Sequence, residues 1–491
     1  MRYDFVVIGA GISGIASAIT LAQNGHQVAL LEKTDRTAPL LRGFSRRGVH
    51  FDTGFHYSGG LGAGEPLDTF FRYLGLSSHI SSFPFDEDGF DLFSCESHNF
   101  EFRVPSGYAR LRERLCEAFP DDCKAIVSYL SQIRAASTAM PYLNSDPDAS
   151  LQRVFGPTLS EAIDALTGNA LLKSLLCMHS LLYGVSCEEV SFAQHAIIVG
   201  NYYESAHGIR GGGLSVARAC DARLAELGVD VLCSSKVTGI TTGPGGALSG
   251  VRLADDSTIL CKGAVSTVHP RLLLDLVPEG LFRPTYRKRL GSLEETVSAF
   301  ICFAISKNPI PALAGANRFL LPDEECIYRL GSRPVGEAPL YLTAAYRDDE
   351  TEPHGFIGIC PALFGETATW SDSRFGRRPE GYRQFKEQAL GRMQSQIERV
   401  YPDLAGNIQF IEGSTPLTIR DFCGTPAGGL YGVKHMVGQF NPSPATRIPG
   451  LFLAGQAVVA PGVMGAVISG LLACGSILGH DVMRKEIKAC C

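Results

Sequence analysis

The stretch DFVVIGAGISG, residues 4–14, decides the fold of this chain. Its first half, residues 4–8, is a short apolar run rich in β-branched side chains, which is typical of a buried strand. An alanine-rich helical stretch follows to about residue 23, and residues 27–31 form a second apolar run. This order of strand, glycine turn, helix and strand predicts a βαβ unit within an α/β fold.

The turn inside this unit has the pattern GxGxxG. In such a turn Gly9 allows the tight bend, Gly11 lets the backbone approach a pyrophosphate, and Gly14 lets the helix pack on the strand. The N-terminus of the helix also directs its free N–H groups toward the phosphate charge. We therefore predict that this loop binds a dinucleotide, with Ala10 and Ser13 among the contacts.

Glu32 ends the second strand, 18 residues after Gly14. A carboxylate at this position accepts hydrogen bonds from ribose hydroxyls, and it argues against a 2′-phosphate there. The sequence contains no second complete GxGxxG, which favours FAD over a tightly held nicotinamide as the resident cofactor. We predict an FAD site that includes Glu32 and the neighbouring Lys33.

Composition excludes several classes of protein. The chain has 491 residues, 45% of them hydrophobic and 19% charged, which predicts a folded protein rather than a disordered or fibrous one. The net charge is −6 without a long basic block, so we expect no nucleic-acid partner. The 15 cysteines form no CxxC pair and no metal-ligand spacing, so we expect no metal site and mostly reduced cysteines.

The sequence also bears on localisation. The N-terminus lacks the basic and long apolar regions of a signal peptide, and no run of about 18 apolar residues predicts a transmembrane span. We expect a cytoplasmic protein, with membrane association left open.

The rest of the chain predicts a discontinuous second domain. Segments within residues 66–205 have helical patterns and few strand signals, whereas residues 297–304, 340–346 and 356–360 resemble strands and residues 381–400 a long charged helix. The αβ pattern of the first domain returns in between and again near the C-terminus.

These shifts predict a Rossmann-type FAD-binding domain of residues 1–65, 206–290 and 425–491. The remaining segments, 66–205 and 291–424, are expected to form a mixed α+β substrate-binding domain.

Several further blocks carry a family resemblance. They are FDTGFHY (residues 51–57), TPLT (415–418), GTPAG (424–428), GLFLAGQ (450–456) and PGVMGA (461–466). Together with the first glycine loop they resemble the FAD-dependent phytoene desaturase superfamily, which has an amine oxidase-like fold. The FDTGxHY block and the AGQ ending are most similar to the retinol saturase and carotenoid isomerase branch.

The resemblance implies roles for individual residues. The first glycine loop would hold the FAD pyrophosphate, Glu32 the adenosine ribose, and the backbone of Val237 the adenine. Gly455 and Gln456 would lie near the ribityl phosphate. The helix start under the isoalloxazine would comprise Gly462, Val463, Met464 and Gly465.

The chain also departs from the family. Ala38 and Pro39 stand where the family has a pair of glycines, so we expect the loop over the ribose to take another path. Gln456 is followed by Ala457 rather than by an acid; its neutral amide can still bond ribityl or phosphate oxygens.

Three residues are candidates for chemistry beside the flavin. His56 is either a proton donor or hydrogen-bonding group at the ring, or a structural histidine that fixes its loop. Tyr57 is the second candidate. Arg420 either lines the flavin and substrate cavity or pairs with Asp421 or another acid.

The resemblance implies a long apolar polyene or isoprenoid, retinoid- or carotenoid-like, as substrate. Leucine-rich helical segments over residues 159–185 offer an apolar face that either docks on a membrane or packs in the core. Three functions remain open: an oxidoreductase that adds or removes hydrogen at a double bond, a redox-neutral cis-trans isomerase or cyclase, and a non-enzymatic flavoprotein. The electron partner stays unknown.

Overall fold

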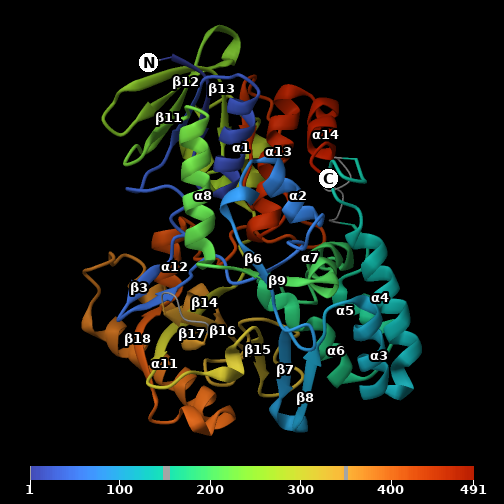
Figure 1. Cartoon of the computed structure of the whole chain (residues 1–491). Helices are drawn as coiled ribbons and strands as arrows, with labels where there is room; N and C mark the ends of the chain where they lie inside the picture. The colour runs from blue at the N-terminus through green and yellow to red at the C-terminus, as the bar shows by residue number, and fades with distance from the viewer. Residues whose placement is uncertain (1, 147–154, 348–351) are drawn as a thin grey trace.

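In the computed structural model, which describes residues 2–146, 155–347 and 352–491, the predicted βαβ unit forms the middle of a seven-stranded sheet (Figure 1). The strand order is β10-β2-β1-β13-β12-β11, with β19 beside β13. The strands are β1 (Arg2–Ile8), β2 (Val28–Leu31), β10 (Asp230–Leu232), β11 (Val237–Thr242), β12 (Leu248–Leu253), β13 (Thr258–Ser266) and β19 (Leu451–Leu453). The predicted α/β class is confirmed.

One helix packs on β1, β2 and β13 of this sheet, and two further helices pack on that helix. Helix α1 (Ile12–Gln23) contacts both α8 (Gly212–Glu226) and α13 (Gly462–Leu478), which lie on its two sides in Figure 1. Gly470 makes the contact with α13 close, because a Cβ there would lie 2.6 Å from the Ser13 carbonyl oxygen. The first and last parts of the chain thus share one core.

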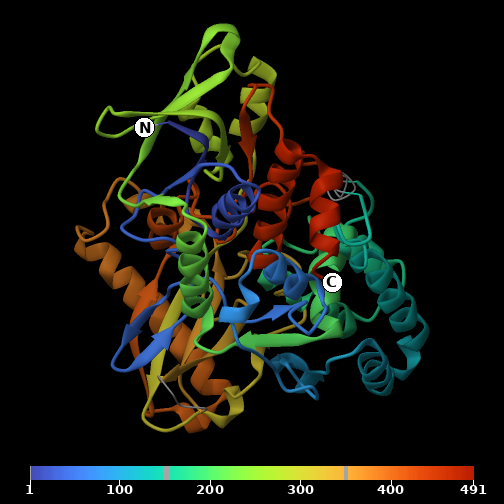
Figure 2. The same cartoon turned by 45° about the horizontal axis from the view of Figure 1, so that its top comes forward.

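A nine-stranded sheet lies at the opposite end of the molecule, at the bottom of both views (Figure 2). Its main path is β18-β14-β17-β16-β15-β7-β8, and the hairpin β3–β4 pairs with β16. The strands are β3 (Phe44–Arg46), β4 (Val49–Phe51), β7 (Asp91–Cys95), β8 (Phe100–Val104), β14 (Ser298–Ser306), β15 (Asn317–Leu321), β16 (Leu340–Arg347), β17 (Pro353–Ala362) and β18 (Ile408–Ser414). The long helix α11 (Glu380–Val400) packs against β14 and β18.

The expectation of few strands between residues 66 and 205 was incomplete. Helices α2 (Pro66–Tyr73), α3 (Tyr108–Ala118), α4 (Cys123–Ser137) and α7 (Phe192–Glu204) are present, but so are β7 and β8. Every residue of β7 is buried, including the polar Asp91 and Ser94, and these polar side chains obscure the apolar run that marks a buried strand.

The leucine-rich helical stretch expected over residues 159–185 is broken into α5 (Leu159–Asp164), α6 (Ala170–Cys177) and a 3₁₀ segment (Met178–Leu182). Asn169 ends the gap by capping α6, since its side-chain oxygen accepts a bond from the Leu172 N–H (3.1 Å). The leucines of this region do not form an exposed membrane-docking face. Leu172, Leu175, Leu176 and Leu181 are buried in the second core.

The expectations about the cysteines and about membrane-spanning helices can also be compared with the structure. Thirteen of the cysteines are free, nine of them buried, and Cys116 and Cys123 form a disulfide. Among the described residues, no helix is both long enough and apolar enough to cross a membrane.

Candidate functional site

The strands β1, β13 and β19 are neighbours and run parallel, so the loops that follow them meet at one edge of the first sheet. Thr267 follows β13 between the other two loops. Its hydroxyl donates to the Ile8 carbonyl (2.9 Å), and a Cβ on Gly455 would lie 3.5 Å from its carbonyl oxygen. The fold therefore brings the predicted pyrophosphate and ribityl-phosphate loops together.

The three glycines of the first loop face different surroundings. Gly9 has a φ of +100°, and a Cβ on it would lie 2.3 Å from Thr267 Oγ1. A Cβ on Gly14 would lie 2.0 Å from the Gly9 carbonyl oxygen, whereas one on Gly11 meets nothing within 4 Å. The protein's own packing thus requires the outer glycines, while Gly11 borders open space that a ligand can fill.

The start of α1 is rich in free donors. Its N-cap is Gly11, which has no side chain to bond the N–H groups of the first turn. The Ser13 hydroxyl is buried nearby and has no hydrogen-bond partner in the described part of the chain. These donors fit the phosphate oxygens of a dinucleotide.

Glu32 is buried, with 6% of its surface exposed. One carboxylate oxygen accepts a bond from the Ala10 N–H and the other from the Thr34 N–H, both at 2.9 Å. Each oxygen retains a second lone pair that can accept a ribose hydroxyl. Glu32 therefore fixes the glycine loop and also remains able to bind the ribose.

The loop after Glu32 keeps a glycine-like turn without glycine. Ala38 has a φ of +46°, in the left-handed region that favours glycine. Its N–H donates to the Ala10 carbonyl (2.7 Å), and this bond holds the turn against the cofactor loop.

Two other predicted contacts, Lys33 and Val237, differ in their exposure. Lys33 is exposed, and its Nζ is 3.1 Å from the position that a Cβ on Gly424 would occupy. Val237 begins β11 and is buried, and the register of the strand pair shifts directly after it.

The second glycine cluster ends at another open helix start. Gln456, after β19, has its carbonyl oxygen 2.7 Å from Nε2 of His435. Helix α13 begins at Gly462, where no side chain caps the first turn and a Cβ would meet nothing within 4 Å. Gly465 packs tightly instead, since its Cβ would lie 2.4 Å from the Ala460 carbonyl oxygen. Gly462 therefore resembles Gly11 in bordering free space beside uncapped N–H groups.

A cavity of about 90 Å³ begins where α13 starts. His56, Tyr57, Gly462 and Val463, all predicted as site residues, line it together. Met464 lies one residue further on, with its Cε 2.8 Å from the position of a Cβ on Gly60. The remaining walls are mainly aromatic and aliphatic, and include Tyr202, Tyr341, Tyr431, Leu181, Leu182 and Ile359.

His56 is half-buried in the cavity wall. Among the described residues, neither of its ring nitrogens has a hydrogen-bond partner. Burial lowers the pKa of His56, and the nearby Asp52 carboxylate opposes this shift only in part. The ring is therefore neutral near pH 7 and free to bond a ligand.

Tyr57 is held more firmly. Its hydroxyl donates to Asp91 Oδ2 at 2.8 Å, and its ring stacks on Phe85 with centroids 5.5 Å apart. Burial, followed by the charge of Asp91, raises the pKa of Tyr57 well above its usual value. The side chain is thus a neutral phenol.

Arg420 does not line this cavity. Its Nε donates to Asp421 Oδ1 (2.9 Å) and its Nη1 donates to the Ser371 carbonyl (2.7 Å). Of the two expected roles, the geometry favours the ion pair.

Sequence reasoning missed the tyrosines Tyr202, Tyr341 and Tyr431, and the buried pair of Asp91 and His179 behind Tyr57. These residues come from five separate segments. No motif in the sequence assigns them a place at the cavity, and only the sheet register and the chain crossings bring them together.

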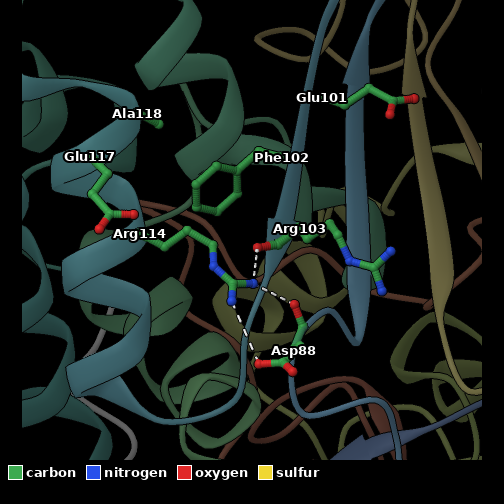
Figure 3. Close-up of a pocket in the computed structure, with 7 residues that line it drawn as sticks. All are labelled: Asp88, Glu101, Phe102, Arg103, Arg114, Glu117 and Ala118. Carbon is green, nitrogen blue, oxygen red and sulfur yellow. Dashed lines mark hydrogen bonds and ion pairs between the residues drawn. The ribbon is translucent and has the colours of Figure 1, made fainter.

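A second pocket, of about 610 Å³, has a different character. Figure 3 shows its charged walls, where Arg114 of α3 lies 3.6 Å from the Asp88 carboxylate beside β8. Such walls do not suit an apolar substrate. Within the described residues, no cluster of histidine, cysteine and acidic side chains could hold a metal ion.

Comparisons with known proteins agree with this geometry. The family model for flavin containing amine oxidoreductases matches residues 12–478. The all-trans-retinol 13,14-reductase of Danio rerio is 26% identical over 98% of this chain and 87% of its own length. The chloroplastic prolycopene isomerase of Arabidopsis thaliana is 22% identical over 99% of this chain and 84% of its own.

Among solved structures, an oxidoreductase from Methanosarcina mazei covers 97% of this chain with all of its own, at a TM-score of 0.68 and 16% identity. This likeness concerns the fold. The resemblance to the phytoene desaturase superfamily is confirmed by the relatives. The chain belongs to the flavin containing amine oxidoreductases, and its cofactor is FAD.

Proposed function

We propose that this protein is an FAD-dependent oxidoreductase that adds or removes hydrogen at a double bond of an apolar conjugated polyene. The observation that carries the proposal is the cavity of aromatic and aliphatic side chains that begins at the α13 start. The two relatives described above are named for a retinoid and a carotenoid, both of which are such polyenes.

The chain's own residues divide the work. The α1 loop and Glu32 bind the dinucleotide, and the α13 start lies where the ring is expected. When bound, FAD supplies hydride exchange at N5. The cavity walls orient the polyene and exclude water, and the neutral His56 can hold a proton or bond the ring.

The size of the cavity adds a requirement. Its 90 Å³ is well below the about 300–1,000 Å³ of sites that enclose a whole small molecule. A polyene must therefore separate the walls or insert only one end.

The test is anaerobic photoreduction of the FAD-loaded protein, followed by addition of all-trans-retinol or a carotenoid. An oxidoreductase in the saturating direction reoxidises one flavin per product, and the product gains two hydrogens by mass spectrometry. In the desaturating direction, a second sample whose FAD is left oxidised shows reduction of the flavin, and the product loses two hydrogens. Turnover of no polyene in either direction would overturn the proposal.

A redox-neutral isomerase is the alternative, because one relative is a prolycopene isomerase. In the same experiment it would change the retention time of the polyene without changing its mass or consuming flavin equivalents. The assay thus separates the two reactions directly.

The domain division follows the same proposal. Residues 1–65, 206–290 and 425–491 form the FAD-binding domain, and residues 66–205 and 291–424 the substrate-binding domain. All strands of the first sheet fall within the first set. The hairpin β3–β4 crosses between the two, since it belongs to the first set in sequence and pairs with β16 in the second sheet.

Peripheral membrane contact of a cytoplasmic protein would give access to an apolar substrate. Its support is an aromatic pair on the surface, Phe375 and Phe422, which are 65% and 55% exposed with ring centroids 5.0 Å apart. Arg374 and Arg377 are exposed in the same loop. Aromatic rings beside cations suit an anionic bilayer surface.

A further inference from the structure

Two walls of the cavity converge on a single buried carboxylate. Asp91, at the start of β7, is fully buried. Its Oδ2 accepts a bond from the Tyr57 hydroxyl and lies 2.8 Å from Nε2 of His179. Its Oδ1 accepts a bond from Asn317 Nδ2, also at 2.8 Å. One carboxylate therefore joins three elements that are far apart in the sequence.

Two of these partners belong to cavity-lining segments. Tyr57 is part of the wall formed by residues 54–58, and His179 lies in the 3₁₀ segment that supplies Leu181 and Leu182 to the cavity. His179 is itself fully buried, and its Nδ1 has no partner among the described residues. Its bond to Asp91 is thus the polar contact that fixes the ring.

His56 and its neighbour Tyr57 differ in how their side chains are held. His56 lines the cavity, but no described residue forms a hydrogen bond with its ring. Its neighbour Tyr57 is fixed by Asp91 and by stacking on Phe85. The position of His56 therefore depends on a bond made by the adjacent residue.

We propose that Asp91, together with His179, is a positioning residue of the active site: it holds Tyr57, and through it His56, at the cavity wall. Neither Asp91 nor His179 lines the cavity, so neither is a catalytic residue here. The inference deepens the proposed function and rests on it for the identity of the ligand, but not for the geometry.

The structure suggests how to separate this role from bulk stability. In an Asp91→Asn variant the amide oxygen can still accept bonds from Tyr57 and His179. Its NH₂ would then face Asn317, whose buried Oδ1 has no partner in the described structure and can accept it if that amide turns over. Asp91→Leu removes both acceptors at similar volume, and Tyr57→Phe removes only the hydroxyl.

The experiment compares these three variants and the Tyr57→Phe/Asp91→Leu double variant, all loaded with FAD. Asp88→Asn, at an exposed aspartate three residues away, is the matched control. Hydrogen exchange is followed in peptides covering residues 54–58 and 178–184. Affinity for all-trans-retinol, used as the probe, is measured by fluorescence.

We expect Tyr57→Phe and Asp91→Leu each to speed exchange in residues 54–58 and to weaken retinol binding by about tenfold or more, since small displacements at a site are costly. The double variant should be no worse than the stronger single change, because both remove the same bond. The retinol affinity of Asp91→Asn should lie within about twofold of that of the parent protein, and the affinity of Asp88→Asn should equal that of the parent.

Three results would overturn the proposal: unchanged exchange of residues 54–58 in Tyr57→Phe, additive losses in the double variant, or an Asp91→Asn variant as impaired as Asp91→Leu. If Asp91→Leu does not fold, Tyr57→Phe and Asp91→Asn still decide. A parent protein that binds no polyene would refute the proposed function instead, while the exchange data would still test the positioning role.

Discussion

At the scale of single residues, Gly11 gives the most direct test of the cofactor loop. Its φ of −71° is available to any residue, and a Cβ there meets no protein atom within 4 Å. We expect Gly11→Val to fold normally but to lose FAD, because the new side chain fills the space that the pyrophosphate needs. Flavin absorbance per protein after gel filtration measures the loss, and far-UV circular dichroism checks the fold.

Gly14→Ala is the matched control for this variant. Its Cβ would collide with the Gly9 carbonyl, so it should lower the melting temperature even without FAD. If Gly11→Val retained its flavin, the loop would not bind the pyrophosphate.

Replacing Glu32 should weaken FAD binding less than replacing Gly11. Glu32→Ala removes an acceptor for the ribose hydroxyls and the bonds to Ala10 and Thr34. Hydrogen bonds to a charged group are each worth about 1.5–3 kcal/mol, so FAD affinity should fall by roughly 10- to 150-fold without being abolished. Titration of the apoprotein with FAD measures this change, and an unaltered affinity would place the ribose elsewhere.

Replacing His56 tests whether its side chain takes part in the reaction. If His56 passes a proton or bonds the reduced ring, His56→Ala should keep FAD and lower turnover by about a hundredfold or more. Single-turnover flavin oxidation, flavin content and melting temperature are measured on one preparation. Normal turnover per flavin would remove His56 from the reaction, and a joint loss of flavin and thermal stability would assign it a structural role.

These residues also show what a sequence can predict at this scale. The dinucleotide loop is local, so strand, glycines and helix start could be predicted from eleven consecutive residues. His56 and Tyr57 could be proposed from their block, but Asp91 behind them could not. Its role depends on the register of β7 with β15, which places Asp91 opposite Asn317, and no spacing in the chain reveals that.

At the scale of elements, helix α7 carries a buried titratable group that predicts how the fold responds to acid. His195 is fully buried, and its two ring nitrogens meet the hydroxyls of Tyr129 and Tyr183 at 2.9 and 2.8 Å. Burial lowers the pKa of His195 to about 3. The unfolded chain, with a histidine pKa of about 6.5, therefore binds the proton more readily than the folded one.

The stability that depends on neutral His195 is present above about pH 6.5 and is lost as the pH falls toward 3. Between pH 7 and pH 5 this residue alone should cost about 2 kcal/mol in the free energy of unfolding. Denaturant unfolding at both pH values measures the change. His195→Gln places an amide that does not titrate at the site, so its free energy of unfolding should drop less between the two pH values, by about that amount. His98→Gln, at an exposed histidine, should show the same drop as the parent protein.

The elements differ in how clearly the sequence marks them. Helix α11 and strands β14, β16 and β17 follow visible patterns and lie close to their expected bounds. Strand β7 was missed because a functional carboxylate occupies a position where an apolar residue would mark a buried strand. Asp91 thus has two effects: it holds the cavity wall, and its polar side chain interrupts the apolar pattern from which β7 could have been predicted.

At the scale of the whole molecule, the surface aromatic pair predicts membrane binding. The FAD-loaded protein should float with vesicles that contain anionic lipid and should float less with neutral ones, because the exposed Arg374 and Arg377 lie on either side of Phe375 in the sequence. Phe375→Ser with Phe422→Ser should abolish flotation without altering flavin content. Equal flotation of the parent and the double variant would exclude this surface.

FAD should also act as a cross-link between distant parts of the chain. The open helix starts of α1 and α13 come from opposite ends of the sequence, yet their loops flank Thr267 at one sheet edge. A ligand that binds only the folded state stabilises it by about 2.7 kcal/mol at a hundredfold excess over its Kd. We therefore expect added FAD to raise the melting temperature of the apoprotein, in proportion to the logarithm of the FAD concentration.

FMN is the control for this prediction. Because it lacks the adenosine half, it cannot reach Glu32 and the α1 start together with the α13 start, so it should raise the melting temperature much less. Equal shifts with FMN and FAD would mean that Glu32 and the other contacts expected for the adenosine half contribute nothing to binding, because FMN keeps a phosphate but lacks that half.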